Sequence, residues 1–139
     1  MYYNKVMKRS RLSKKKKNRS PKEILRDKAW AIFSKYIRAR DKKCVSCETG
    51  MAENAGHFWH AVLDFDDMNV NGQCVRCNKW LSGNLAPYAA YLIKKHGVKK
   101  FKELELRHYK AMAGEYRTES DYEAIIEKYT KLYEEIKEI

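Results

Sequence analysis

The sequence predicts an α+β fold that is mostly helical, with a small core flanked by N-terminal and C-terminal helices. Near both ends of the chain, apolar residues recur at three- and four-residue spacing, which is the period of an amphipathic helix. The middle of the chain has less helical periodicity and contains the four cysteines, arranged as two Cys-x-x-Cys pairs. A length of 139 residues accommodates one domain with extensions.

Residues 1–19 are predicted to form a basic arm that is disordered on its own. The arm contains nine lysine and arginine residues and no acidic residue, whereas residues 20–139 contain 21 basic and 18 acidic residues. Most of the net charge of +12 therefore lies on the arm. Clustered positive charge suits a phosphate backbone, because each neutralised phosphate releases counterions. A solvated tail without a partner is the alternative.

Residues 20–42 are predicted to contain the N-terminal helix. Ser20 can cap this helix, Pro21 fits its first turn and Glu23 completes a capping box. The apolar stripe that follows consists of Leu25, Ala29, Ile32, Phe33, Tyr36 and Ile37. We expect the helix to end near Arg40 and to serve as a scaffold.

Residues 43–97 are predicted to form the core. It contains a cysteine knuckle, a short β-hairpin with residues 56–62 as one strand, and a helix from the second cysteine pair through Trp80. Pro87 is expected to open a further helix that ends at Gly97.

Residues 98–139 are predicted to be a helical extension. One helix is expected over residues 99–109, and a second is expected to begin at Thr118, which has the spacing of a cap with Asp121. The last helix either packs on the core or pairs with a second subunit, and core packing is the preferred interpretation. No run approaches the ~18 apolar residues of a membrane span, so no membrane partner is expected.

The two cysteine pairs predict a structural zinc site. Its ligands are Cys44, Cys47, Cys74 and Cys77, and 26 residues separate the pairs. Each Cys-x-x-Cys can direct both sulfurs at one ion, and four soft thiolates suit Zn²⁺ in a closed tetrahedral site. We expect a reducing, cytosolic setting, where paired cysteines favour metal over a disulfide. Four sulfurs leave no open position for a substrate, so any catalysis lies elsewhere.

One histidine and two asparagines lie close to these cysteines in the sequence. His57 falls on the predicted hairpin, Asn69 precedes the second cysteine pair, and Asn78 directly follows it. This is the layout of the ββα-metal nuclease site, also called HNH. In that chemistry a neutral histidine deprotonates water, a hairpin asparagine orients the histidine, and a helix residue binds a divalent cation. Four-cysteine ribbons also serve as binding modules, so the residues alone leave both interpretations open.

The string CVSC…NAGHF…DFDDMNVNGQCVRCNKWLSGNLAPY resembles the phage NinG family, also called Rap. The shared features lie over residues 43–97, about half of the chain. Members of that family look like HNH-type endonucleases for branched recombination intermediates. The Cys-x-x-Cys-Asn arrangement is also similar to that of endonuclease VII, another phage junction resolvase, where this asparagine holds Mg²⁺.

The resemblance implies His57 as general base, Asn69 as its positioning partner and Asn78 as a Mg²⁺ ligand. Many HNH sites have an acidic metal ligand immediately before the histidine, and here that position is Gly56. Asp66 is the first choice for the missing ligand. The other candidates are Asp64, Asp67 and Asn54.

We therefore expect a structure-selective DNA endonuclease that cuts Holliday junctions or other branched intermediates, including D-loops, with Mg²⁺ or Mn²⁺. Symmetrical cutting needs two active sites, so we expect a homodimer formed through the last helix or the N-terminal helix. The expected DNA-contacting residues are Lys14, Lys15, Lys16, Lys17, Arg19, Arg76 and Lys79. The resemblance implies a phage-encoded protein in the cytoplasm of a bacterial host. The alternatives are a non-catalytic zinc-containing DNA-binding module and a less selective HNH nuclease.

Overall fold

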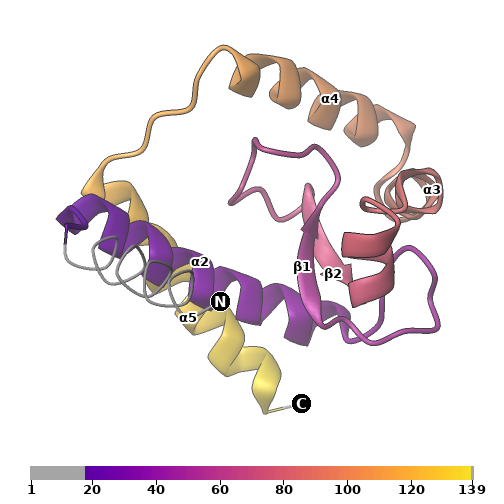
Figure 1. The fold of residues 1–139 in the computed structure, drawn as a ribbon, viewed down its shortest axis with the longest axis horizontal. Coiled ribbons are helices and arrows are strands. Elements are labelled where there is room, and N and C mark those ends of the chain that lie inside the picture. Colours follow the sequence, from indigo (N-terminus) through magenta and orange to yellow (C-terminus); the bar gives the residue numbers. More distant parts are fainter. Residues whose placement is uncertain (1–17, 139) are drawn as a thin grey trace, which may run out of the picture.

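A computed structural model describes residues 18–138 and confirms the mostly helical α+β class (Figure 1). Lys14–Lys17 lie outside the described residues, as does most of the predicted arm. The elements in chain order are α2 (Pro21–Asp41), β1 (Asn54–His57), β2 (Val70–Gln73), a π-helical turn η1 (Arg76–Trp80), α3 (Leu85–His96), α4 (Val98–Met112) and α5 (Glu119–Lys137). No helix among the described residues is both long enough and apolar enough to cross a bilayer.

Both predicted capping boxes are confirmed. The Ser20 hydroxyl accepts from the Glu23 amide, and the Glu23 carboxylate accepts from the Ser20 amide. Thr118 and Asp121 make the same reciprocal pair at the start of α5. Each cap satisfies amides that have no partner inside the helix, so the sequence defines where both helices begin.

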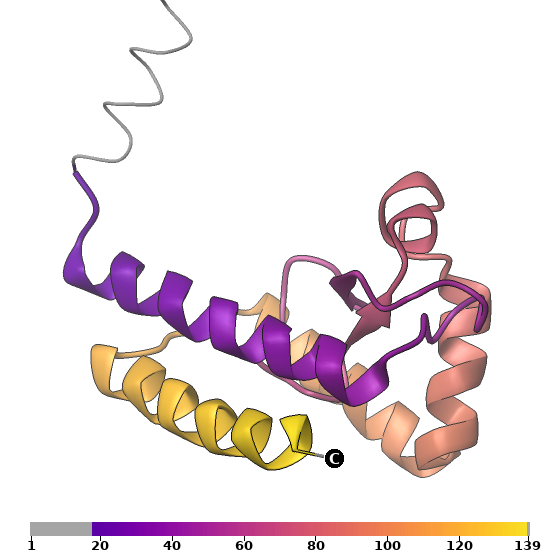
Figure 2. The same cartoon turned by 90° about the horizontal axis from the view of Figure 1, so that it is seen from below.

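Helices α2 and α5 run side by side, as Figures 1 and 2 show. Phe33 and Tyr129 meet between them edge to face, with ring centroids 4.7 Å apart. Ile37 and Val70 complete this fully buried cluster, so the helix pair also covers the hairpin. The preferred interpretation of the last helix, packing on the core of its own chain, is confirmed.

The predicted hairpin is confirmed, but its first strand is shorter than expected. β1 and β2 pair antiparallel, with Asn54 opposite Gln73 and His57 opposite Val70. The chain leaves the strand after His57, not at residue 62, because residues 59–63 turn back. Within that turn Ala61 and Leu63 have φ of 64° and 54°, a conformation in which a strand cannot continue.

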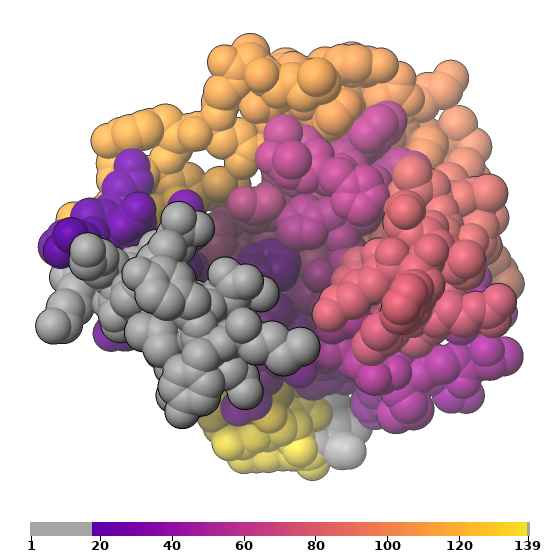
Figure 3. All heavy atoms as spheres, in the orientation of Figure 1, coloured from indigo at the N-terminus to yellow at the C-terminus, as the bar shows by residue number. Residues whose placement is uncertain are grey.

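A second apolar core joins the hairpin loop to α3 and α4. Its buried members include Phe58, Leu63, Met68, Tyr88, Leu92 and Leu104. In Figure 3 the loop between the strands (magenta) lies at the surface beside α4 (orange) and the segment containing η1 (coral). α3 begins two residues before the predicted Pro87, which falls within its first turn. α4 exceeds its predicted range at both ends.

Candidate functional site

The four cysteines converge on one point. Their sulfur atoms all lie within 4.8 Å of one another, and the Sγ atoms of Cys47 and Cys74 are 3.8 Å apart. A tetrahedron with Zn–S bonds of about 2.3 Å has S···S edges of about 3.8 Å. Within residues 18–138 this is the one cluster of three or more His, Cys, Asp or Glu side chains suited to a metal. The geometry therefore fits the predicted Cys₄ set, which could hold zinc.

The surroundings of the sulfurs differ between the two knuckles. The Thr49 hydroxyl, followed by the backbone amides of Gly50 and Thr49, lowers the pKa of the Cys47 thiol. Burial raises the pKa of the Cys77 thiol. A bound metal would supply the positive charge that stabilises the sulfurs as thiolates.

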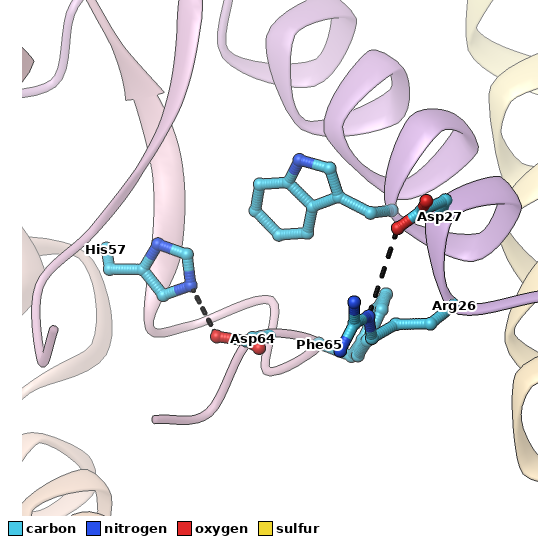
Figure 4. A pocket seen from close by; sticks show the side chains of 6 residues that line it. Arg26, Asp27, His57, Asp64 and Phe65 are labelled. Atoms are coloured by element: carbon cyan, nitrogen blue, oxygen red, sulfur yellow. Dashed lines mark hydrogen bonds and ion pairs between the residues drawn. The ribbon is translucent and has the colours of Figure 1, made fainter. Parts of the chain in front are cut away.

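His57 is paired with a carboxylate, and that carboxylate belongs to Asp64. His57 Nε2 and Asp64 Oδ1 are 3.0 Å apart (Figure 4). The hydrogen bond from His57 lowers the pKa of Asp64. An ionised carboxylate only accepts, so Nε2–H donates, and in the neutral imidazole this tautomer has its lone pair on Nδ1. The side chains of His57 and Asp64 are 21% and 49% exposed, so solvent reaches the pair.

The imidazole also forms part of a cavity of about 190 Å³ against α2. Trp30 stacks on the His57 ring with centroids 5.5 Å apart and an interplanar angle of 15°. The cavity is lined by Arg26, Asp27, Trp30, His57, Asp64 and Phe65, five of which are labelled in Figure 4. Its wall thus combines aromatic faces, two carboxylates and a guanidinium around one histidine.

Asn69 supports the loop after His57 instead of contacting the imidazole. This side chain is fully buried. Its Oδ1 accepts from the Trp59 amide at 2.8 Å, and its Nδ2 donates to the carbonyls of Trp59 and Val62. The expectation that Asn69 contacts and orients the histidine is therefore wrong. Asn69 instead fixes the turn that leads to Asp64, and it is Asp64 that contacts His57.

Asp66 is committed to other partners, which corrects its expected role as a cation ligand. Its Oδ2 accepts from Arg107 Nε at 2.8 Å, and its Oδ1 accepts from the backbone amides of Met68 and Asn69. Asp67 is likewise bonded to the Tyr129 hydroxyl. Both acids therefore anchor the hairpin loop to neighbouring helices.

Asn78 lies against the residue before His57. If Gly56 carried a Cβ, that atom would be 2.9 Å from Asn78 Oδ1. Side chains alternate along a strand, so Gly56 and His57 have opposite faces, and the His57 face packs on α2. The structure thus brings Asn78 to the backbone beside His57 but not to the same face of the hairpin as the imidazole.

Three of the expected DNA-contacting residues can be placed. Arg76 and Lys79 are exposed on η1, on either side of Asn78. Arg19 forms an ion pair with Asp27 at the start of α2. Trp80 follows Lys79 and is 80% exposed, which is unusual for a tryptophan.

Two further site residues were not singled out by the sequence. Trp30 was not among the residues of the predicted stripe, although it lies three residues before Phe33 and packs on the same cluster. Its contact with His57 depends on tertiary packing. Tyr88 is fully buried, and its hydroxyl donates to the Gly56 carbonyl at 2.8 Å and accepts from Asn71 Nδ2. Tyr88 ends the stretch that resembles the NinG family, but no local pattern predicts that bond.

Together the fold and the site define a helix-flanked β-hairpin protein with a cluster of four cysteines that could hold a metal ion and with a histidine–carboxylate pair. Residues 3–138 match the family model described as Bacteriophage Lambda NinG protein. The chain therefore belongs to the NinG family.

Individual relatives agree with this assignment. The chain is 35% identical over 96 residues to "Protein ninG" of Salmonella phage P22, covering 63% of this chain and 47% of that protein. The corresponding protein of Escherichia phage lambda is 34% identical over 96 residues, with coverage of 63% and 47%. The chain thus spans about half the length of the curated relatives it matches. No solved structure matches it.

Proposed function

We propose that the chain is a structure-selective DNA endonuclease of the HNH, endonuclease VII-like kind. It would hydrolyse phosphodiesters of four-way junctions or other branched recombination intermediates in the cytoplasm of a phage-infected bacterium. The observation that carries the proposal is the His57–Asp64 pair, which leaves Nδ1 of His57 free to accept a proton. Asn78 directly follows the last cysteine and lies next to Gly56, the residue before His57.

The two groups face opposite sides of the hairpin, which restricts where a substrate can bind. β1 pairs only with β2 in the described sheet, so its other edge has no strand partner. A phosphodiester lying along that edge, at the Gly56–His57 peptide, could approach both groups. We therefore expect the scissile phosphate at the edge of β1 and not on either face.

Each residue of the site would then have a separate role in phosphodiester hydrolysis. His57 Nδ1 would accept the proton of the attacking water, while Asp64 holds the ring and stabilises the imidazolium that forms. Asn78 supplies an amide oxygen suited to Mg²⁺ or Mn²⁺. A cation bound there would stabilise the developing charge on the phosphate and the leaving oxygen. Arg76, Lys79 and the basic arm would contact neighbouring phosphates.

A specific observation favours the alternative of a non-catalytic DNA-binding module. Within residues 18–138 there is no carboxylate-rich cluster for a second metal, and Gly56 provides no acid before His57. The binding module predicts salt-sensitive DNA binding without cleavage. A less selective HNH nuclease predicts equal cleavage of linear duplex and junction.

Cleavage of a fluorescent four-way junction separates these functions. The zinc-loaded protein is incubated with Mg²⁺ and the junction, then with the matched linear duplex. Wild type should nick the junction preferentially, His57→Ala should lose nicking, and His60→Ala should retain it as the matched control. Nicking by His57→Ala at the wild-type rate would remove His57 from the mechanism, and an absence of nicking by wild type would favour the binding module.

Dimerisation is part of this proposal. α2 and α5 use their apolar faces on each other, so neither offers a free apolar face for the expected interface. α4 instead exposes Leu106, Tyr109 and Met112, each more than half exposed. Leu106→Glu should shift the sedimentation coefficient toward that of a monomer if this surface joins two copies, and an unchanged coefficient would exclude α4.

A further inference from the structure

Gln73 is the one fully buried side chain of the hairpin that has an acceptor without a partner. It lies directly before Cys74, at the end of β2. Its Nε2 donates to the Ser46 hydroxyl at 2.8 Å and to the Gly83 carbonyl at 2.6 Å. Its Oε1 is buried and makes no hydrogen bond. The Gly83 carbonyl can only accept, so the amide cannot be turned over to exchange its two ends.

The Gln73 oxygen points at the same small volume as Asn78. A Cβ added to Gly56 would lie 1.9 Å from Gln73 Oε1 and 2.9 Å from Asn78 Oδ1. These two distances place the oxygens no more than 4.8 Å apart, where their negative partial charges repel each other, and a buried unpaired oxygen is costly. A cation between the two oxygens would remove both penalties.

Gly56 is the reason that both oxygens can reach this volume. The Gln73 oxygen occupies the space that any larger residue at position 56 would fill. An acidic residue immediately before His57 would therefore displace it. The amide oxygen from the neighbouring strand takes the place of that missing acid.

From this geometry we infer that Gln73 Oε1 and Asn78 Oδ1 together bind the divalent cation, in a shell that contains no net protein charge. The inference rests on the proposed endonuclease function for the purpose of the cation. Mg²⁺ is normally held by one or two carboxylates together with substrate phosphates. With neutral amides as the protein ligands, the charge must come from the DNA phosphates. Cation and DNA then raise each other's affinity by the same factor.

The test uses the side-chain amide signals of Gln73 and Asn78 in NMR spectra of the zinc-loaded full chain. Mn²⁺ is titrated first alone and then with a duplex oligonucleotide. Paramagnetic broadening should affect both amides together, and the oligonucleotide should lower the required Mn²⁺ at least about tenfold, which is about 1.4 kcal/mol of coupling.

Two variants then assign the effect to the residue. Gln73→Met removes the amide at similar length and should abolish the broadening of Asn78 at the same Mn²⁺ concentration. Asn71→Leu is the matched control, because Asn71 is equally buried on the same strand and face but bonds to Met68 and Tyr88. The control should retain the broadening.

Three results would overturn the inference. Broadening of Asn78 that persists in Gln73→Met at the same Mn²⁺ concentration would assign the cation to Asn78 alone and leave the proposed nuclease intact. Two sharp signals, with an Asn78 amide proton protected from exchange, would indicate a direct Asn78–Gln73 hydrogen bond instead. Sharp signals together with an uncut junction would remove both the cation site and the nuclease.

Discussion

The substitution Gly56→Ala tests the packing at the centre of the site. The added Cβ would lie 1.9 Å from Gln73 Oε1 and 2.8 Å from Gln73 Cδ. Gln73 can move away only by giving up its hydrogen bonds to Ser46 and Gly83. Gly56 does not have positive φ, so the cost comes from this contact and not from backbone strain.

The expected cost combines two effects. Overpacking a filled site costs roughly 1–3 kcal/mol, and a buried donor left without a partner costs roughly 1–3 kcal/mol. We expect the free energy of unfolding to fall by about 2–4 kcal/mol, measured by urea denaturation at a fixed excess of zinc. Gly114→Ala is the control, because Gly114 has φ of 130° and nothing within 4 Å, so its cost is backbone strain alone.

A double-mutant cycle with Gln73→Ala identifies the cause. If the clash with Gln73 dominates, Gly56→Ala should cost little once Gln73 is already truncated, giving a coupling of at least about 1 kcal/mol. Gly114→Ala should remain additive with Gln73→Ala. An unfolding free energy for Gly56→Ala within about 0.5 kcal/mol of wild type, or full additivity of the pair, would refute this account of the packing.

Three further predictions concern the metal, the acid and the exposed tryptophan. Removal of zinc by a chelator should abolish amide exchange protection around both knuckles, because the cysteine cluster contains no other apolar residue. The α2–α5 pair should keep more of its protection. Unchanged protection around the knuckles would contradict a structural metal. The pKa of the Asp64 carboxyl, measured by NMR, should lie below 3.8, so the bond to His57 stabilises the fold above the ordinary carboxyl pKa, and this stability is lost as pH falls through the lowered pKa. His57→Gln should return the pKa toward 3.8. A wild-type pKa already at 3.8 would refute the pairing. Trp80→Ala should weaken binding of branched DNA by about 1–3 kcal/mol through lost base stacking and leave the melting temperature of the protein unchanged, because the ring is exposed. Equal DNA affinities of the variant and the wild type would show that the ring does not contact DNA.

Features that depend on neighbours in the chain could be predicted from the sequence. Ser20 and Glu23 are three residues apart, so the capping box follows from spacing alone. The convergence of the cysteines follows equally from two Cys-x-x-Cys pairs around a hairpin. Helix type and order were predictable for the same reason, although π-helical geometry at η1 was not.

The choice of acid beside His57 could not be predicted, because it depends on the path of a loop. Asp64 and Asp66 are two residues apart, and the turn that selects Asp64 requires positive φ at Ala61 and Leu63, for which neither residue type is a signal. The role of Gln73 is equally non-local. Its significance arises from Gly56 on the opposite strand and Asn78 beyond the second cysteine pair.

The most direct test of the central claim is the position of the divalent cation relative to His57. A crystal of the zinc-loaded protein with Mn²⁺ and a non-cleavable four-way junction would locate it by anomalous scattering. We predict a manganese peak within about 2.5 Å of Asn78 Oδ1, with a DNA phosphate at the free edge of β1 beside the His57 ring. A manganese ion bound elsewhere, or DNA that leaves this edge of the hairpin uncovered, would contradict the proposed site.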